Sequence, residues 1–211
     1  MKFLLSIAFI AIITCQFGRA DENSAAVLNE INLARTRPAE YAQFVLSEAD
    51  SRSRSDERAM REAVNFLAKA KPLPPLTFSN GLAMGAMAHV VNQGGAGTVG
   101  HAGTDRSTPW DRMGRYGKWM GTAGENISYG IAAPRQIVIS LIVDAGVSNR
   151  GHRKNIFSRD FGVAGVASGS HAKWGTMCVM DFAGGFVEDQ QSSETRKSSA
   201  TSVWKSSTTI L

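Results

Sequence analysis

The 211-residue sequence predicts an α+β fold, because helical and extended patterns occupy separate parts of the chain. Apolar residues recur at helical spacing over much of the first 90 residues and again after residue 134. Two apolar runs of strand type follow, near residues 161–167 and 174–182. Helices that precede strands, instead of alternating with them, favour α+β over a parallel α/β sheet. The length suits one domain with a sizeable core.

The first helices are indicated by start signals as well as by periodicity. Ser24 can cap a helix that begins near Ala25. Pro38 interrupts this helix and can occupy the first turn of a second one. Residues 56–70 predict a third helix with an apolar side. The proline-rich residues 71–76 predict an extended connector.

The middle of the chain mixes helical and irregular patterns. Ser79 or Asn80 can cap a helix on which His89 faces the core or the edge of a cleft. Residues 93–130 are rich in glycine and polar side chains, which predicts a long irregular segment of functional rather than structural importance. Pro134 fits the first turn of a further helix.

The last third predicts two strands and a tail. A turn at residues 168–171 would join the strands and leave His171 facing solvent. Residues 187–211 are rich in serine and threonine and lack periodicity, so we expect a disordered tail.

The N-terminus predicts export. A positive residue, an apolar run and a small-residue cleavage region follow one another in residues 1–20, as in a secretory signal peptide. The apolar run at residues 3–14 is shorter than the roughly 20 residues that span a bilayer. We therefore expect a secreted chain, extracellular or periplasmic, with no transmembrane segment after cleavage. A buried core helix and lipid anchoring at Cys15 are the alternatives.

Charge and cysteine content narrow the class of protein. Cleavage after Ala20 would lower the formal charge from +5 to +3, and the acids and bases near residues 50–62 interleave. This pattern is typical of a solvated helix face and predicts no nucleic-acid partner. Cys178 would be the single cysteine left, within an apolar run, so we expect a buried small side chain rather than a reactive thiol or a disulfide.

Three residues flanked by glycine could carry chemistry: His101, Glu125 and His152. Glycine lets the backbone turn tightly and present the neighbouring side chain. A carboxylate near imidazoles can orient them or share a divalent cation with them. The spacing of these residues matches no local metal motif, and nothing matches a nucleotide-binding loop.

Four short motifs occur in the order found in a known family. They are Asn32-Leu33-Ala34-Arg35, Gly100-His101, Gly124-Glu125-Asn126-Ile127 and Gly151-His152-Arg153-Lys154-Asn155. The chain resembles the CAP superfamily of cysteine-rich secretory proteins, antigen five and pathogenesis-related proteins (SCP domains), and most of all its disulfide-poor secreted branch. The resemblance covers about residues 25–186 and implies a domain at residues 21–186. It also implies a three-layer α-β-α sandwich with a central antiparallel sheet.

The resemblance implies a cleft with two histidines and two acids. The histidines correspond to His101 and His152, and the first acid to Glu125. Asp144 stands where the family usually has a glutamate after a tryptophan, and the tryptophan is absent here. In some members this cleft binds Zn²⁺ or another divalent cation, so His101 and His152 are the implied metal ligands. Asn32 and Arg35 are expected to bond backbone and brace the sheet.

Three functions stay open at this point. The first is a secreted binding module for an extracellular ligand: a lipid, a sterol, a peptide or a wall component. The second is a hydrolase that uses a metal-bound water or a histidine–carboxylate pair, although no serine lies in a Gly-x-Ser-x-Gly context. The third is a recognition protein whose histidines and acids are structural.

Overall fold

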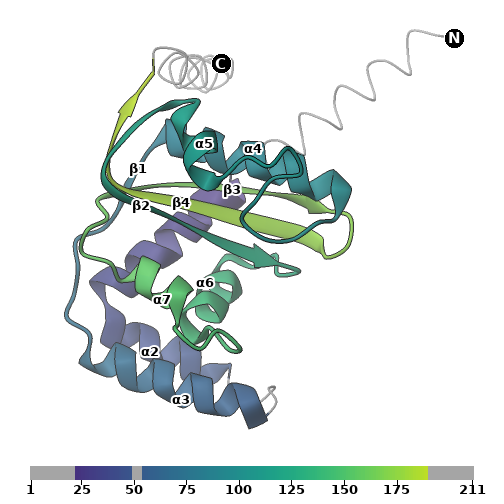
Figure 1. Cartoon of the computed structure of the whole chain (residues 1–211). Helices are drawn as coiled ribbons and strands as arrows, with labels where there is room; N and C mark the ends of the chain where they lie inside the picture. Colours follow the sequence, from purple (N-terminus) through teal and green to yellow (C-terminus); the bar gives the residue numbers. More distant parts are fainter. Residues whose placement is uncertain (1–21, 49–53, 190–211) are drawn as a thin grey trace, which may run out of the picture.

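The computed structural model describes residues 22–48 and 54–189, and it has three layers (Figure 1). A four-stranded sheet lies between two groups of helices, as an α+β three-layer sandwich requires. The strands are β1 (Thr77–Phe78), β2 (Gly117–Tyr129), β3 (Val163–His171) and β4 (Gly175–Glu188). The predicted signal peptide and most of the predicted tail lie outside the described residues, and β4 ends at the second residue of that tail.

The sheet order is β1-β3-β4-β2, so β4, the last strand among the described residues, lies in the interior of the sheet. β4 pairs antiparallel with both β3 and β2, and the short β1 adds a parallel pair at one edge. The sheet is therefore antiparallel through its centre and mixed at that edge.

Two helices cover one face of the sheet, and the remaining helices cover the other (Figure 1). α4 (Asn80–Ala96) and α5 (Pro109–Gly114) form the smaller layer. The larger layer contains a helix across residues 22–36 and four further helices. They are α2 (Pro38–Ser47), α3 (Arg54–Lys69), α6 (Pro134–Val143) and α7 (Gly151–Ile156).

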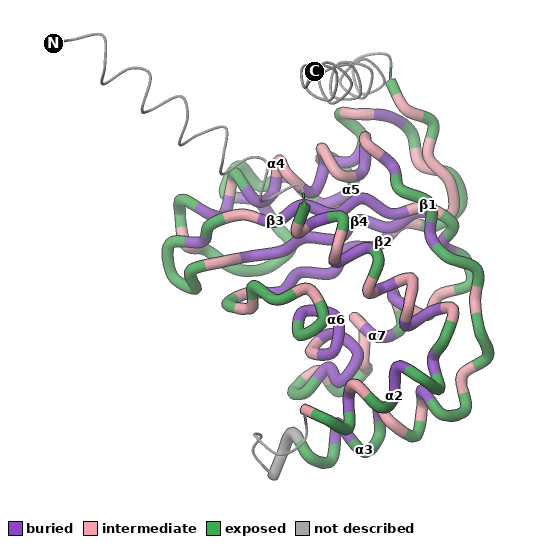
Figure 2. Tube along the Cα trace, turned by 180° about the vertical axis from the view of Figure 1, so that it is seen from behind, coloured by how far each residue is buried: buried purple, intermediate pink, exposed green. Residues whose placement is uncertain are grey.

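The side chains of β4 alternate between the two layers. Cys178, Met180 and Phe182 belong to the core cluster of the larger helical layer. Val179 packs with residues of α4, and Ala183 packs with residues of α4 and α5. This period of two is what a strand buried on both faces requires, and Figure 2 shows the resulting buried run along the sheet.

Several local predictions are confirmed. Ser79 is the N-cap of α4 and accepts a hydrogen bond from the backbone N–H of Leu82. Pro38 and Pro134 occupy the first turns of α2 and α6. Cys178 is buried and unpaired with any other cysteine of the described chain, and burial raises the pKa of its thiol to about 12.

Arginines tie the larger layer together, and the expectation that Arg35 bonds backbone is confirmed. Arg35 is buried and donates to the backbone carbonyls of Pro74, Ile156, Ser158 and Phe161. Glu62 of α3 accepts from Arg150 and Arg153. Hydrogen bonds, first from Arg150 and then from Arg153, lower the pKa of the Glu62 carboxyl to about 2 despite some desolvation.

Two predictions are wrong. The segment 93–130 is largely regular, because α4 continues to Ala96, and α5 and β2 follow. His171 is buried rather than solvent-facing: it ends β3, and only residues 172–174 form the turn. Backbone N–H groups of Lys173 and Trp174 donate to its Nδ1 atom, which leaves Nε2–H to donate to the carbonyl of Thr98 at 2.8 Å.

None of the helices in the described part of the chain is long and apolar enough to cross a membrane.

Candidate functional site

A polar cavity of about 330 Å³ opens at the edge of the sheet formed by β2, between residues of the two helical layers. We call it the His–acid cleft. His101 comes from the loop between α4 and α5, Glu125 from β2, and His152 from α7. The other lining residues are Val147, Asn149, Gly151 and Asn155. The structure therefore brings three of the four sequence-predicted site residues to one cavity, and the fourth, Asp144, lies directly behind His152.

The loop that presents His101 is tied to α4. Gly97 ends α4 in the left-handed conformation with φ of 66°, and Gly100 has φ of 108°. These values favour glycine, because a side chain there would be strained. His89 and Gln93 of α4 both bond the carbonyl of Gly100 at 2.9 Å. The backbone immediately before His101 is thus held against α4.

Glu125 connects the His101 ring to a buried arginine. Its Oε1 atom lies 2.8 Å from Nδ1 of His101, and its Oε2 atom accepts from Nη2 of Arg112 at 2.7 Å. Both Glu125 and Arg112 have side chains that are 1% exposed, whereas the His101 side chain is 53% exposed. Arg112 also donates to the carbonyls of Ser107 and His101. The exposed ring is therefore supported by a buried ion pair.

His152 has its own carboxylate, supplied by the corner between α6 and α7. Asp144 ends α6 in the left-handed conformation, with φ of 54°, which aspartate tolerates better than most residues. Its Oδ1 atom lies 2.7 Å from Nδ1 of His152, and Oδ2 accepts from the backbone N–H of His152 at 3.0 Å. The shorter acid therefore reaches the ring because it sits at the start of the turn that leads into α7.

Two asparagines join the halves of the cleft. Asn126 of β2 donates to the carbonyl of His152 at 3.0 Å, and Asn155 of α7 donates to Oδ1 of Asn126 at 2.8 Å. Asn126 is fully buried. These bonds fix α7 against β2, and with it the position of His152 relative to Glu125.

Arg112, Asn126 and Asn155 were not predicted as site residues, although both asparagines lie within the motifs named above. Their polar side chains carry no periodic signal, so nothing in the local pattern distinguishes them from solvated residues. For the asparagines, the one available signal is proximity to the glycine-flanked glutamate and histidine. By contrast, the expectation that Asn32 bonds backbone is confirmed, since it exchanges hydrogen bonds with both backbone groups of Leu76.

The hydrogen bonds assign roles to the ring nitrogens of the two cleft histidines. A carboxylate only accepts hydrogen bonds, so Nδ1 of each ring is the protonated nitrogen. In a neutral ring Nε2 then carries the free lone pair. Each histidine can therefore accept a proton or a hydrogen bond, or bind a cation, through Nε2.

The donor set limits the kind of metal the cleft could hold. Within residues 22–48 and 54–189 there is no group of three or more His, Cys, Asp and Glu side chains arranged to hold a metal ion. Catalytic zinc sites commonly have three protein ligands, and structural ones four. The described residues thus do not fit a resident zinc of either type, and two imidazoles are the most they offer.

His89 lies close behind the cleft and is fully buried. Its Nε2 atom bonds the carbonyl of Gly100, which requires Nε2–H, while Nδ1 has no partner within the described chain. Burial lowers the pKa of His89, so the ring stays neutral. His89 therefore acts as a neutral support for the loop, in agreement with its expected place in the core.

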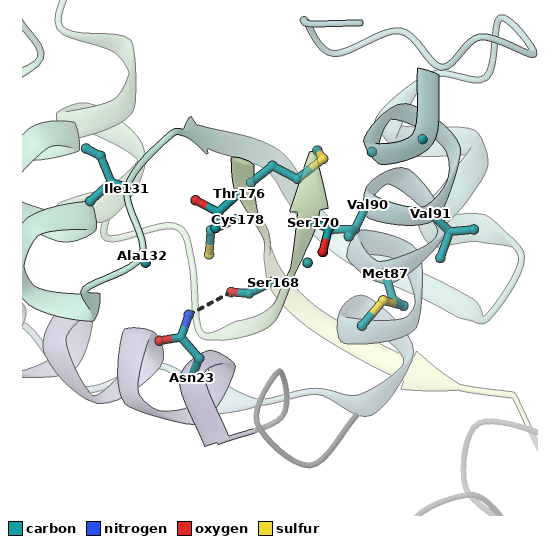
Figure 3. A pocket seen from close by; sticks show the side chains of 14 residues that line it. Asn23, Met87, Val90, Val91, Ile131, Ala132, Ser168, Ser170, Thr176 and Cys178 are labelled. Atoms are coloured by element: carbon teal, nitrogen blue, oxygen red, sulfur yellow. Dashed lines mark hydrogen bonds between the residues drawn. The ribbon is translucent and has the colours of Figure 1, made fainter. Parts of the chain in front are cut away.

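A second, larger cavity of about 790 Å³ lies between α4 and residues 131–132, which follow β2 (Figure 3). We call it the α4 groove. Met87, Val90 and Val91 of α4 line one side, and Ile131 and Ala132 line the opposite side. Its lining is mainly apolar, although Asn23 donates to the hydroxyl of Ser168 at its rim. The chain thus has a polar cleft and an apolar groove at separate places.

Comparison with known proteins identifies a family. The model of the CAP family, described as the cysteine-rich secretory protein family, matches residues 28–182. The uncharacterized protein YkwD of Bacillus subtilis is 27% identical over an alignment of 164 residues, and the match covers 74% of this chain. The chain spans 57% of the length of that relative.

Two solved structures are similar at lower identity. One is an extracellular protein containing an SCP domain from Bacillus anthracis, with 22% identity and a TM-score of 0.42 over 61% of this chain and 37% of that one. The other is an outer surface protein of Borrelia burgdorferi, with 17% identity and a TM-score of 0.45 over 68% of this chain and 92% of that one.

Proposed function

Since the chain belongs to the cysteine-rich secretory protein (CAP) family, we propose that it acts outside the cytoplasm as a binding module whose His–acid cleft holds a polar ligand. The observation that carries this proposal is the matched pair of imidazoles. Each has Nδ1 bonded to a carboxylate, at 2.8 Å for His101 and 2.7 Å for His152, which leaves Nε2 for a ligand.

Size and chemistry favour a short segment of peptide or wall glycan over a sterol in this cleft. A volume of about 330 Å³ is near the lower end of small-molecule sites. Its lining offers two ring nitrogens and the amides of Asn149 and Asn155, with Val147 as the main apolar contact. Peptides and glycans carry the hydroxyl and amide groups that these atoms can bond.

The hydrogen bonds also prepare the rings for such a ligand. A side chain that is already oriented loses less conformational freedom when it binds. His152 is held through both its ring and its backbone N–H, and His101 is held through Glu125. The buried carboxylates therefore serve as positioning groups. The ligand contacts are assigned to the two imidazole rings and to Asn149 and Asn155.

Hydrolysis by a metal-free histidine–carboxylate pair is the alternative for the same cleft. None of its seven lining residues carries a hydroxyl or a thiol, so a covalent intermediate on serine or cysteine has no candidate there. A hydrolytic reaction would need His101 or His152 to take a proton from water through Nε2. Replacement of Glu125 by Gln should then abolish turnover, and activity that survives the change would exclude this route.

A divalent cation in the cleft would have few ligands from the protein itself. His101 and His152 would hold it through Nε2, and the remaining positions would go to water or to the ligand. The carboxylates behind the two rings favour this possibility, because metal-binding histidines usually donate their other N–H to such a group.

A second candidate function is the binding of an apolar ligand, such as a lipid or a sterol, in the α4 groove. The specific observation is the groove's volume of about 790 Å³ and its mainly apolar lining. Such dimensions are typical of sites for drug-sized apolar molecules. This function would use different residues from those of the His–acid cleft, so the two are separable by mutation.

One experiment distinguishes these functions. The purified protein is denatured and its extract is analysed by mass spectrometry for lipids, sterols and polar compounds. In parallel, the protein with ¹⁵N-labelled histidine is titrated with soluble wall glycopeptides and N-acetylated peptides. The proposal predicts that these polar probes shift the Nε2 signals of His101 and His152.

The variants His101→Ala and His152→Ala should each weaken binding of the polar probe at least tenfold. Lys154→Ala is the matched control, because Lys154 lies two residues from His152 but is exposed and outside the cleft. Binding that survives both histidine variants would overturn the proposal. A lipid in the extract whose retention depends on Val90 rather than on the histidines would support the α4 groove.

A further inference from the structure

Asp181 of β4 is a fully buried carboxyl group for which the proposed function has no use. Its exposed fraction is 0%, and it lies on the face of the sheet that α4 and α5 cover. Neither of its carboxyl oxygens has a hydrogen-bond partner among the described residues. If the group were ionised, it could only accept hydrogen bonds and would find no donor. A buried polar group without a partner is uncommon and needs an explanation.

The register of the sheet places Asp181 next to the His–acid cleft. Asp181 is directly opposite Glu125 across the β2–β4 pair, so their side chains leave the same face of the sheet. On its other side β3 presents Gly165, which has no side chain. On α4, Gly85 leaves room for the carboxyl group: a Cβ atom there would be 3.1 Å from Oδ2 of Asp181.

The charges around Asp181 do not allow a second buried carboxylate. The charged groups that act on it are Glu125 from β2 and Arg112 from α5, and α4 contributes the neutral His89 one turn beyond Gly85. Arg112 directs its Nη2 atom to Glu125. One cation therefore compensates one anion, and an ionised Asp181 would be a buried charge without a partner.

A hydrogen on Asp181 removes this problem. A protonated carboxyl can donate to the carboxylate opposite, whose oxygens each accept more than one hydrogen bond. Burial, and after it the charge of Glu125, raise the pKa of Asp181 well above its ordinary value, while Arg112 acts in the opposite direction.

We propose that Asp181 is protonated in the folded protein and donates its carboxyl hydrogen to Glu125, so that it acts as the positioning residue for the carboxylate that orients His101. Glu125 then accepts from three sides: His101, Arg112 and Asp181. The single negative charge of the Asp181–Glu125 pair stays on Glu125, which lines the cleft. The part of the proposal that concerns ligand binding rests on the function proposed above, and the part that concerns the proton does not.

The proton is tested directly by carbon NMR. In protein labelled with ¹³C at the aspartate carboxyl groups, the Asp181 signal is assigned from its loss in Asp181→Asn. We expect this signal at the position of a protonated acid at pH 7, and the exposed Asp160 supplies the reference signal. An Asp181 signal at the carboxylate position at pH 7 would overturn the proposal, whether or not the cleft binds any ligand.

Stability as a function of pH gives an independent measurement. A group whose pKa is higher in the folded state than in the unfolded state stabilises the fold fully at pH values below its unfolded-state pKa. This stabilisation is lost as the pH rises toward the folded-state pKa. The folding constant of the wild type, divided by that of Asp181→Asn, should therefore fall up to tenfold per pH unit above about pH 4. A ratio that does not change between pH 5 and pH 7 would contradict the proposal, and Asp160→Asn supplies the baseline.

The positioning role is tested by rescue. The amide of Asp181→Asn can still donate to Glu125, but the methyl group of Asp181→Ala cannot. We expect binding of the polar probe within threefold of wild type for the asparagine variant and at least tenfold weaker for the alanine variant. Equal binding by the two variants would exclude the positioning role. If neither the wild type nor the variants bind the probe while the carbon signal is that of a protonated acid, the proposed function fails and the proton assignment stands.

Discussion

Replacement of Arg112 by methionine tests whether the buried ion pair beneath the His–acid cleft is an essential part of the fold. Arg112 is 1% exposed, and its guanidinium donates to a carbonyl of Ser107, a carbonyl of His101 and the carboxylate of Glu125. Methionine is similar in length but removes every donor. Glu125 would then be a buried carboxylate without its cation.

The expected loss follows from the cost of an unpaired buried charge. Removal of one partner of a buried ion pair typically destabilises a protein by about 3–5 kcal/mol. For a domain of this size each kcal/mol lowers the melting temperature by about 2–4 °C. Arg112→Met should therefore lower the melting temperature at neutral pH by about 6–20 °C, measured by circular dichroism and checked by urea unfolding.

Two further variants make this test specific. Arg115→Met removes an exposed arginine whose partner, Asp105, is 3.4 Å away and also exposed, so it should cost about 1 kcal/mol or less. The double variant Arg112→Met with Glu125→Gln removes both charges and should be more stable than Arg112→Met alone. A loss of less than about 1 kcal/mol for Arg112→Met, or a double variant that is less stable than the single one, would refute the reasoning.

Three other outcomes follow from the structure. Because the pKa of Glu62 is low in the folded protein, this carboxylate stabilises the fold at pH values above the ordinary carboxyl pKa, and the stabilisation is lost as the pH falls toward about 2. Glu62→Gln should therefore lower the urea midpoint at pH 7 but not at pH 2. Gly165→Ala would bring a Cβ atom against the backbone of α4 and should lower the free energy of unfolding by about 1–3 kcal/mol or more. Gly95 lies in a helix with open space around it, so Gly95→Ala should raise the free energy of unfolding by about 0.5–1 kcal/mol. Equal unfolding midpoints for the two variants would contradict this. Zn²⁺ at tenfold excess over its dissociation constant should stabilise the protein by about 1.4 kcal/mol, and a thermal shift that persists in the variant with both His101 and His152 changed to Ala would place the ion elsewhere.

The helices of the larger layer could be predicted because burial there uses apolar side chains at regular spacing. Val27, Ile31 and Ala34 are all fully buried, as the helical period requires. Proline at residues 38 and 134 marked two helix starts, because its missing N–H is not needed in the first turn. In these elements local preference and tertiary packing point to the same structure.

The prediction for β2 was wrong for a reason connected with the site. Its buried half contains Glu125, Asn126 and Ser128, which occupy interior positions where a strand would ordinarily carry apolar side chains. Hydrogen bonds from Arg112 to Glu125 and from Asn155 to Asn126 compensate their burial. Since these partners come from other elements of the fold, no local pattern could show that a polar, glycine-containing segment forms a strand.

The cleft histidines and their acids were identified by their likeness to family motifs, and the contacts of His101 with Glu125 and of His152 with Asp144 agree with that grouping. Their role in binding a ligand stays a prediction. His171 was misplaced because a serine and glycine segment has the composition of a turn, while the actual turn lies at residues 172–174. The backbone N–H groups of that turn hold the ring in place.

The interior position of β4 has a consequence for how the protein is made. β4 is the last strand of the described chain, yet it separates β3 from β2 and supplies both of their long pairings. On a ribosome, β3 cannot complete its pairing until residue 183 has been synthesised, and β2 cannot do so until residue 188, where β4 ends. A nascent chain thus remains without a completed sheet until β4 has been made, and a truncation before β4 would remove the centre of the domain rather than trim its edge.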